Sequence, residues 1–373
     1  MRMTDFKYVG EPPALREAIK RLSGCRSISV DLESDSYHHY SEKIALVQVC
    51  GDGSIFIMDP LAVDLSPLSD LLADAGIEKV FHDVDYDGRM LLTFLGVKPA
   101  PVFDTMIAAR VLGKERVGLA DLLAEYFGLS LDKKFQKADW SRRPLGGEML
   151  EYAALDVAYL ASLRDALAAE LEKAGRMYWA REEFERLVEG LEPMPARSAD
   201  FTRVKGARDL SPRRLAVLRE LLLWREERAR ESDVPSFKIV GNDRLLRVAE
   251  ECPRSRAQLA AAKILSDRQI ARFGTDILKA VERGMRTPRE SLPSFPPATH
   301  QRRDFTAEKI LRELKACRDR KAEELGMDPG FLLPNAVLKA VARLKPADAA
   351  ALEESGLLKG WRLGVMKEIL SGR

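Results

Sequence analysis

The sequence predicts a mixed α/β domain followed by two small all-helical modules. The first half alternates strand-like and helix-like segments, and the second half is helical throughout. Two proline-containing stretches without periodicity, 192–200 and 289–303, divide the chain. Its 373 residues are enough for two or three domains. We therefore expect domains at 1–200, 208–288 and 304–373, with a linker at 289–303.

The strand-like segments of the first half are short, β-branched and bounded by turn residues. They lie at 27–32, 44–49, 54–59, 79–83 and 102–105. Short connections between the first three favour antiparallel neighbours. Helices are expected at 65–75, at 86–96, after 105 to 112, and continuously from about 118 to 191. This alternation is typical of a layered α/β fold.

The second half predicts two small helical bundles of similar length. Ser211 and Pro212 form an N-cap and first-turn signal for a leucine-rich, arginine-rich helix. A second helical segment, with Trp361 near its end, follows the linker. Each module has about 70–80 residues, which suffices for a helical bundle. The two modules are candidates for diverged copies of one unit.

Composition predicts a cytoplasmic, core-forming protein with no membrane contact. Hydrophobic residues make up 46% of the chain and charged residues 32%. No apolar run approaches the roughly 18 residues of a membrane span. The start, MRMTDFKYVGEPP, lacks an apolar signal region. The four cysteines are far apart in the sequence, which argues against a disulfide framework or a zinc site.

The net charge of +2 conceals an asymmetry between the two halves. Residues 1–200 carry a net charge of −10, and residues 201–373 carry +12. An acidic half can hold cations, and a basic half can hold a polyanion such as nucleic acid. The alternative is that both halves merely present solvated surfaces.

Acidic residues gather at the ends of two predicted strands. Asp31 and Glu33 are two residues apart on a strand, so their carboxylates share one face. The alternative for this pair is a solvated strand end. Asp83 and Asp85 are positioned to cap the next helix, and Asp87 lies in its first turn, from which it can face a cleft.

Tyr152 and Asp156 place a phenol and a carboxylate on one ridge of a predicted helix. Together with Asp31, Glu33 and Asp87, Asp156 completes four carboxylates from separate elements. Such a set can hold two hard divalent cations, which clamp a scissile phosphate when they lie about 4 Å apart. The phenol can orient the attacking water or help to deprotonate it.

Three motifs resemble, in order, those of the DEDDy 3′–5′ exonucleases. They are D-L-E at 31–33, H-x-x-x-x-D at 82–87 and Y-x-x-x-D at 152–156. The run KKFQKADWSRRPLGGEMLEYAALDVAYL at 133–160 is similar to ribonuclease D. LWREERARESDVPSFKIVGNDRLLRVAEECP at 223–253 resembles the HRDC domain, a nucleic-acid-binding helical module. The segment 304–373 resembles a second HRDC domain in its length, position and FLLPN sequence.

The resemblance implies an RNase H-like exonuclease domain, with a mixed five-stranded sheet and flanking helices, followed by two all-α HRDC-type bundles. It also implies Mg²⁺- or Mn²⁺-dependent removal of 5′-mononucleotides from RNA 3′ ends, with tRNA precursors carrying 3′ extensions as substrates. No obligate protein partner is implied. By motif, the two metal ions would be held by Asp31, Glu33, Asp87 and Asp156, and Tyr152 would position the water.

Seven further residues are candidates for RNA contact. They are Gln48, His82, Lys134, Gln136, Trp140, Arg142 and Arg143. Arginine can grip a phosphate bidentately, and tryptophan can stack on a base. The alternatives are core packing for Trp140, packing at a strand end for His82, and structural ion pairs for the two arginines. His38 and His39 either contact the 3′-terminal nucleotide or lie in an exposed loop.

Two other functions remain open from the residues alone. A DNA exonuclease of the same superfamily would use the same site chemistry, because the 2′-hydroxyl is what separates the two substrates. The absence of a polymerase or helicase segment from this sequence favours RNA. A catalytically inactive nucleic-acid-binding scaffold is the other alternative, against which stands the presence of all five motif residues.

Overall fold

The computed structural model describes residues 5–132, 134–195, 198–295, 304–345 and 349–371. The chain divides into two compact units. One unit comprises Met1–Ser34, Ile44–Met194 and Gln301–Arg373, and the other comprises Asp35–Lys43 and Pro195–His300. The α/β domain and the second helical module therefore belong to one unit, and the first helical module belongs to the other.

A mixed sheet in the order β1-β4-β3-β2-β5-β6 forms the centre of the α/β domain. The strands are β1 (Phe6–Val9), β2 (Ser27–Ser34), β3 (Ile44–Gly51), β4 (Ser54–Met58), β5 (Glu78–Phe81) and β6 (Val102–Asp104). β2, β3 and β4 are antiparallel neighbours, as predicted. β1 pairs with β4, and β5 pairs with β2 and β6, in parallel.

The prediction of five strands is wrong by one, because β1 adds a sixth at the edge of the sheet. The strand has four residues, and Lys7 and Tyr8 in its centre are exposed. A short edge strand of this kind lacks the continuous apolar run that marks a buried strand. The strand is identified by its parallel pairing with β4 and not by its sequence.

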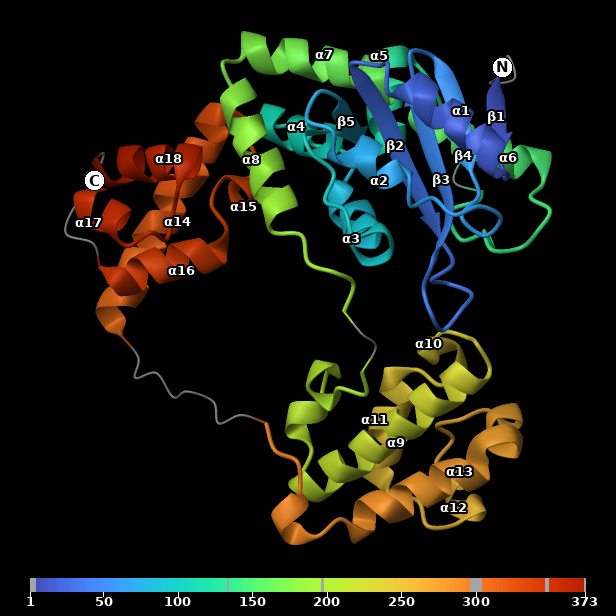
Figure 1. Ribbon diagram of the computed structural model, residues 1–373. Coiled ribbons are helices and arrows are strands. Elements are labelled where there is room, and N and C mark those ends of the chain that lie inside the picture. The colour runs from blue at the N-terminus through green and yellow to red at the C-terminus, as the bar shows by residue number, and fades with distance from the viewer. Residues whose placement is uncertain (1–4, 133, 196–197, 296–303, 346–348, 372–373) are drawn as a thin grey trace. The chain divides into compact units, whose positions relative to one another are not determined.

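Helices cover both faces of the sheet (Figure 1). They are α1 (Pro12–Leu22), α2 (Leu68–Ala73), α3 (Val84–Leu95), α4 (Thr105–Leu112), α5 (Leu119–Phe127), α6 (Gly147–Ala158), α7 (Leu160–Lys173) and α8 (Met177–Glu189). Val30, Val47 and Phe56 share one core with residues of α1, α2 and α3. On the opposite face, Leu46 and Ile57 pack with apolar residues of α6, which lies across the strands that carry the acidic motif.

The segment between α5 and α6 is not the continuous helix that its pattern predicts. α5 ends at Gly128, which has a left-handed φ of 66° that glycine adopts at little cost. The described residues from 129 to 146 form neither helix nor strand. Pro144 and the Gly146-Gly147 pair keep the helix from starting before α6. This irregular segment carries most of the predicted RNA contacts.

The second helical module packs against α8 within the first unit. It consists of α14 (Phe305–Leu325), α15 (Pro329–Leu332), α16 (Asn335–Leu344), α17 (Ala349–Glu354) and α18 (Gly360–Ser371). The rings of Trp179 on α8 and Trp361 on α18 stack with centroids 4.7 Å apart. Phe331 contacts both the core of the module and the core beneath α4, α7 and α8. The α/β domain and this module thus share a packed boundary.

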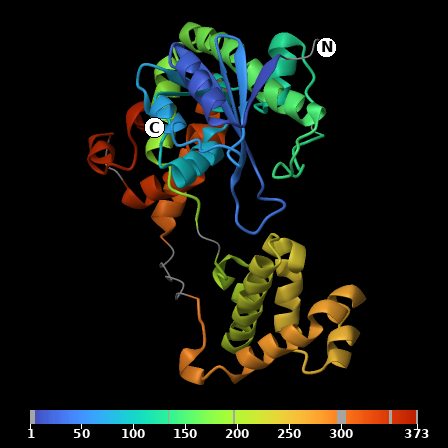
Figure 2. The ribbon, with the colours of Figure 1, turned by 45° about the vertical axis from the view of Figure 1, so that its right-hand side comes forward.

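The first helical module forms its own core in the second unit. It consists of short 3₁₀ turns at Phe201–Arg203, Ala207–Asp209 and Arg289–Ser291 and of α9 (Pro212–Glu231), α10 (Ser236–Ile239), α11 (Asn242–Glu251), α12 (Arg256–Ala261) and α13 (Asp267–Arg286). Ser211 caps α9 as predicted. α11 and α13 lie against α9 (Figures 1 and 2). Part of the predicted linker, 296–303, lies outside the described residues.

The loop Asp35–Lys43 between β2 and β3 groups with this second unit. His39 Nδ1 lies 2.7 Å from Asp233 Oδ2, and the ring of Tyr37 lies edge-on to Phe237 with centroids 6.3 Å apart. His39 is therefore partnered by an aspartate of the helical module, which neither sequence alternative for the loop anticipated.

None of the helices in the described residues is long and apolar enough to cross a membrane. All four cysteines are free thiols.

Candidate active site

Three of the predicted carboxylates converge between the sheet and α6. Asp31 and Glu33 project from β2, and Asp156 projects from α6, with one ligand oxygen of each within 4.8 Å of the others. α6 reaches this position because its opposite side is apolar, and Ala153, Ala154 and Val157 on that side are fully buried against the sheet. The sequence motifs at 31–33 and 152–156 are thus brought together in space.

Asp87 supplies the fourth carboxylate from the first turn of α3, where it is buried. It lies close enough to Asp31 and Glu33 for their charges to repel. Asp104 orients the start of α3, since its Oδ2 accepts a 2.7 Å hydrogen bond from the Val84 amide. The side chain of Asp83, at the N-cap position, makes no capping hydrogen bond.

The electrostatics of this cluster are those of crowded carboxylates. Burial raises the pKa of Asp31, Glu33, Asp87 and Asp156, and mutual repulsion raises the pKa of the last three further. A cation at this point would offset both causes, because it attracts the charged forms of the carboxylates and screens their mutual repulsion. The donor set consists of carboxylate oxygens alone, which suits hard cations such as Mg²⁺ and Mn²⁺. The residues present therefore fit a divalent metal site.

Tyr152 lies beside the carboxylates and packs against two aromatic rings from the irregular segment before α6. Phe135 lies edge-on to it with centroids 5.8 Å apart, and the centroid of Trp140 is 6.1 Å away. Burial, and then the charges of Asp156 and Glu33, raise the pKa of its phenol. A phenol is neutral near pH 7 even at its ordinary pKa, and the shift favours that form further, so Tyr152 carries a proton that can donate a hydrogen bond.

His82 directly follows β5 and is half-buried, with a neutral imidazole. Its Nδ1 lies 2.9 Å from Thr105 Oγ1, which in turn donates to the Phe81 carbonyl at 3.0 Å. Burial, together with the charge of Arg110, lowers its pKa to about 4. These contacts favour a packing role for the histidine over contact with a phosphate.

Three of the predicted RNA contacts have surroundings that favour structural roles. Gln48 is fully buried, and Trp140 is 1% exposed within the core under α6. The Arg143 guanidinium grips the carboxylate of Asp59 with two hydrogen bonds of 2.6 and 2.7 Å. It also donates to the carbonyls of Trp140 and Ala45, so its hydrogen bonds connect the irregular segment to the sheet.

Three other residues predicted to contact RNA are exposed on the irregular segment. Gln136 and Arg142 are open to solvent, and Lys134 pairs at 2.6 Å with the exposed Glu148. An exposed ion pair of this kind costs little to exchange for a phosphate. Lys134, Gln136 and Arg142 therefore remain the candidates for RNA contact.

Three supporting residues were missed by reasoning from the sequence. Asp104 orients α3, Phe135 packs on Tyr152, and Asp59 holds Arg143. The D-T pair at 104–105 is an N-cap signal for α4, which the Asp104 side chain confirms by accepting from the Ile107 amide. Nothing in the sequence pairs Asp59 with Arg143, because they are 84 residues apart.

Known proteins share both parts of this architecture. Residues 6–172 match the family model of a 3′-5′ exonuclease, and residues 214–281 and 307–368 each match the HRDC domain. Fold, acidic site and domain order thus define a 3′–5′ exonuclease joined to two HRDC domains.

Relatives identify the family within this class. Ribonuclease D of Pseudomonas paraeruginosa is 32% identical, across 98% of this chain and 96% of its own length. Ribonuclease D of Nitrobacter hamburgensis is 31% identical, across 93% of this chain and 90% of its own. The chain therefore belongs to the ribonuclease D family, a family of 3′–5′ exoribonucleases.

Solved structures agree with this assignment. The crystal structure of Escherichia coli RNase D, described as an exoribonuclease involved in structured RNA processing, matches with a TM-score of 0.74 and 26% identity. The match covers 99% of this chain and 98% of that one. The catalytic core of RRP6 from Trypanosoma brucei matches 75% of this chain and 80% of its own, with a TM-score of 0.66 and 26% identity.

Proposed function

We propose that this protein trims RNA 3′ ends by two-metal-ion hydrolysis, releasing 5′-mononucleotides. The observation that carries the proposal is the convergence of Asp31, Glu33 and Asp156 within 4.8 Å, with Asp87 beside them. Two divalent cations bound there would activate a water and stabilise the leaving oxygen of the scissile phosphodiester. Mg²⁺ and Mn²⁺ both suit the donor set.

The chain's own residues then have distinct roles. Asp31, Glu33, Asp87 and Asp156 hold the cations from three separate elements, so the site depends on the packing of β2, α3 and α6. Tyr152 orients the attacking water through its hydroxyl, which is protonated near pH 7 as in any ordinary phenol. Phe135 and Trp140 fix the direction of that hydroxyl. Lys134, Gln136 and Arg142 lie on the exposed segment that precedes α6 and would contact the RNA backbone.

The substrate that we propose is a tRNA precursor with a 3′ extension. The family relationship and the two HRDC domains support RNA as the polymer. We propose domains at 1–200, 208–288 and 304–373, with a linker at 289–303. A cytoplasmic site of action remains a prediction of the sequence.

The metal assignment is tested by Asp156→Asn in the full chain. Loss of a metal ligand removes several kcal/mol of transition-state stabilisation, so hydrolysis should fall at least about a hundredfold while RNA binding persists. The assay is a time course on a 3′-extended tRNA with Mg²⁺ or Mn²⁺. Asp165→Asn on the exposed side of α7 is the control, and it should behave as wild type. Wild-type rates from Asp156→Asn would contradict the two-metal assignment.

Tyr152→Phe separates water positioning from metal binding. We expect kcat to fall about a hundredfold, since a positioned proton-transfer group contributes at least that much. Metal affinity, measured by calorimetry without RNA, should be unchanged because the phenol is not a ligand. An equal loss of metal affinity would instead assign the tyrosine to the metal site. Matched RNA and DNA oligonucleotides in the same assay decide the polymer preference.

A further inference from the structure

Gln48 is a fully buried polar side chain that lies next to the proposed metal site. It occupies the centre of β3, where it has no exposed surface. In the described part of the chain, neither its amide oxygen nor its amide nitrogen has a hydrogen-bond partner. A buried amide without partners is costly, and leucine or methionine would fill the same space without that cost. The amide therefore calls for a functional explanation.

The register of the sheet shows which group the amide can serve. Gln48 lies directly opposite Asp31 in the antiparallel β2–β3 pair, so both side chains project from the same face toward α6. Opposed residues of this kind have Cβ atoms about 4.5–5.5 Å apart, well within the reach of a glutamine side chain. Its other cross-strand neighbour, Ile57 on β4, is apolar. Of the two cross-strand neighbours of Gln48, Asp31 is therefore the one that can accept a hydrogen bond from its amide.

Burial excludes the role that the sequence suggested for this residue. A direct contact with RNA requires an accessible side chain, and Gln48 is fully buried in a strand that α6 covers. A side chain that cannot reach the substrate can still act on a group that does. Carboxylates that bind metal ions are commonly oriented by hydrogen bonds from a second layer of residues.

We propose that Gln48 is a positioning residue for Asp31, donating a hydrogen bond from its amide nitrogen to the Asp31 carboxylate when a divalent cation is bound. The inference depends on the proposed function, in which Asp31 is a metal ligand. The glutamine would then contribute to metal affinity without touching the cation or the RNA.

Gln48→Met tests this role, because methionine keeps the length and loses the donor. Binding of Mg²⁺ and Mn²⁺ to the full chain is measured by calorimetry without RNA, and we expect affinity to fall about 10- to 100-fold. In the hydrolysis assay kcat should fall while KM for RNA stays the same. The metal-free protein should melt no lower than wild type, since an unpartnered amide has been removed from the core.

Ser29→Ala is the matched control. Ser29 lies on the same face of β2, is fully buried, and has a hydroxyl without a partner in the described residues, but it faces Cys50 and not a proposed ligand. Its loss should leave metal affinity unchanged. Wild-type metal affinity in Gln48→Met would overturn the inference, as would a raised KM for RNA at unchanged metal affinity.

Asp31→Asn separates this inference from the function on which it depends. If Asp31→Asn binds metal as tightly as wild type, the proposed metal site itself is wrong. If Asp31→Asn loses the metal and Gln48→Met does not, only the role of Gln48 is wrong. A metal-free Gln48→Met that melts lower than wild type would assign the residue to packing and also overturn the proposal.

Discussion

The two HRDC domains share an internal scaffold and differ in what covers it. In the first, Arg225 donates to the Val240 carbonyl at 3.3 Å and to Asn242 Oδ1 at 2.5 Å. In the second, Arg318 donates to the Leu333 carbonyl at 3.2 Å and to Asn335 Oδ1 at 3.0 Å. The same spacing of arginine, carbonyl and asparagine in both supports their origin as copies of one unit.

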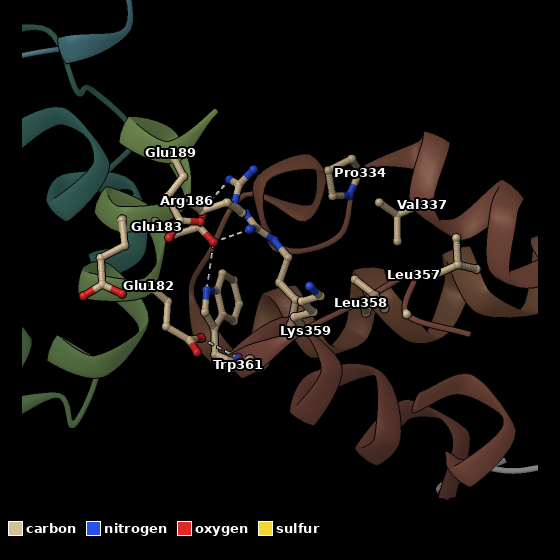
Figure 3. A pocket seen from close by; sticks show the side chains of 14 residues that line it. Glu182, Glu183, Arg186, Glu189, Pro334, Val337, Leu357, Leu358, Lys359 and Trp361 are labelled. Carbon is tan, nitrogen blue, oxygen red and sulfur yellow. Dashed lines mark hydrogen bonds and ion pairs between the residues drawn. The ribbon is translucent and has the colours of Figure 1, made fainter. Parts of the chain in front are cut away.

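The second domain uses its outer surface to bind the exonuclease domain. Glu183 of α8 is 3% exposed and accepts hydrogen bonds from Trp361 Nε1, at 3.0 Å, and from the Arg362 guanidinium. Glu182 accepts from the Trp361 amide at 2.7 Å. These residues line a cavity of about 450 Å³. Figure 3 shows Glu182 and Glu183 of α8 pointing toward Trp361. A buried carboxylate thus joins the two domains.

The first domain leaves the corresponding surface more open, and the domain as a whole is more basic. Its Phe237, in the P-S-F sequence that parallels P-G-F at Phe331, is 57% exposed, whereas Phe331 is partly buried against the exonuclease core. Residues 208–288 carry 18 lysines and arginines against 12 acidic residues, and residues 304–373 carry 13 against 11. The second module belongs to the nuclease unit, and the first carries the larger net positive charge, +6 against +2, which suits RNA.

The largest effect is expected from breaking the Glu183 junction. Glu183→Ala leaves the Arg362 charge and the Trp361 indole without their buried partner, which should cost about 3–5 kcal/mol of unfolding free energy. Denaturant unfolding followed by tryptophan fluorescence measures this loss, because Trp179 and Trp361 stack at the junction.

Glu185→Ala on the same helix is the matched control, since Glu185 is exposed. Its stability should equal that of wild type within about 0.5 kcal/mol. The double variant Glu183→Ala/Arg362→Met should recover part of the loss, because it removes the uncompensated charge. Equal stability of Glu183→Ala and Glu185→Ala would show that the junction contributes nothing.

A smaller loss of stability is expected when the arginine–asparagine hydrogen bond is removed from either HRDC domain. Asn242→Ala and Asn335→Ala each remove one hydrogen bond to a guanidinium, at a cost of about 1–3 kcal/mol. Because only the second domain belongs to the exonuclease unit, Asn335→Ala should shorten the half-life of nuclease activity on heating. Asn242→Ala should leave that half-life unchanged. A similar loss of activity in both variants would contradict the division into two units.

The convergence of the acidic cluster with Tyr152 could be predicted from the sequence because each member lies within a local pattern. Asp31 and Glu33 alternate on a strand, and Tyr152 and Asp156 are one helical turn apart, so local periodicity already places them on common faces. The family resemblance supplied what local patterns lack, namely that the separate elements meet.

The contacts that support the site could not be predicted in the same way. Asp59 and Arg143 are 84 residues apart, and Glu183 and Arg362 are 179 apart, and each reads in isolation as an ordinary surface charge. Gln48 is a candidate for RNA contact in the sequence, whereas the sheet buries it completely. Burial of a polar residue depends on tertiary packing, which periodicity alone does not determine.

The smallest expected effect distinguishes the two HRDC domains as RNA-binding surfaces. Lys238→Glu/Arg247→Glu reverses two exposed charges on the first domain, and Lys339→Glu/Arg343→Glu does the same on the second. If the first domain contacts phosphates, only its variant should weaken RNA binding and flatten the dependence of log affinity on log salt, by about 1 unit per lost contact. Fluorescence anisotropy with labelled RNA at several salt concentrations measures both quantities. Equal weakening by the two pairs would mean that the domains share the RNA, because the charge changes are identical and only their location differs.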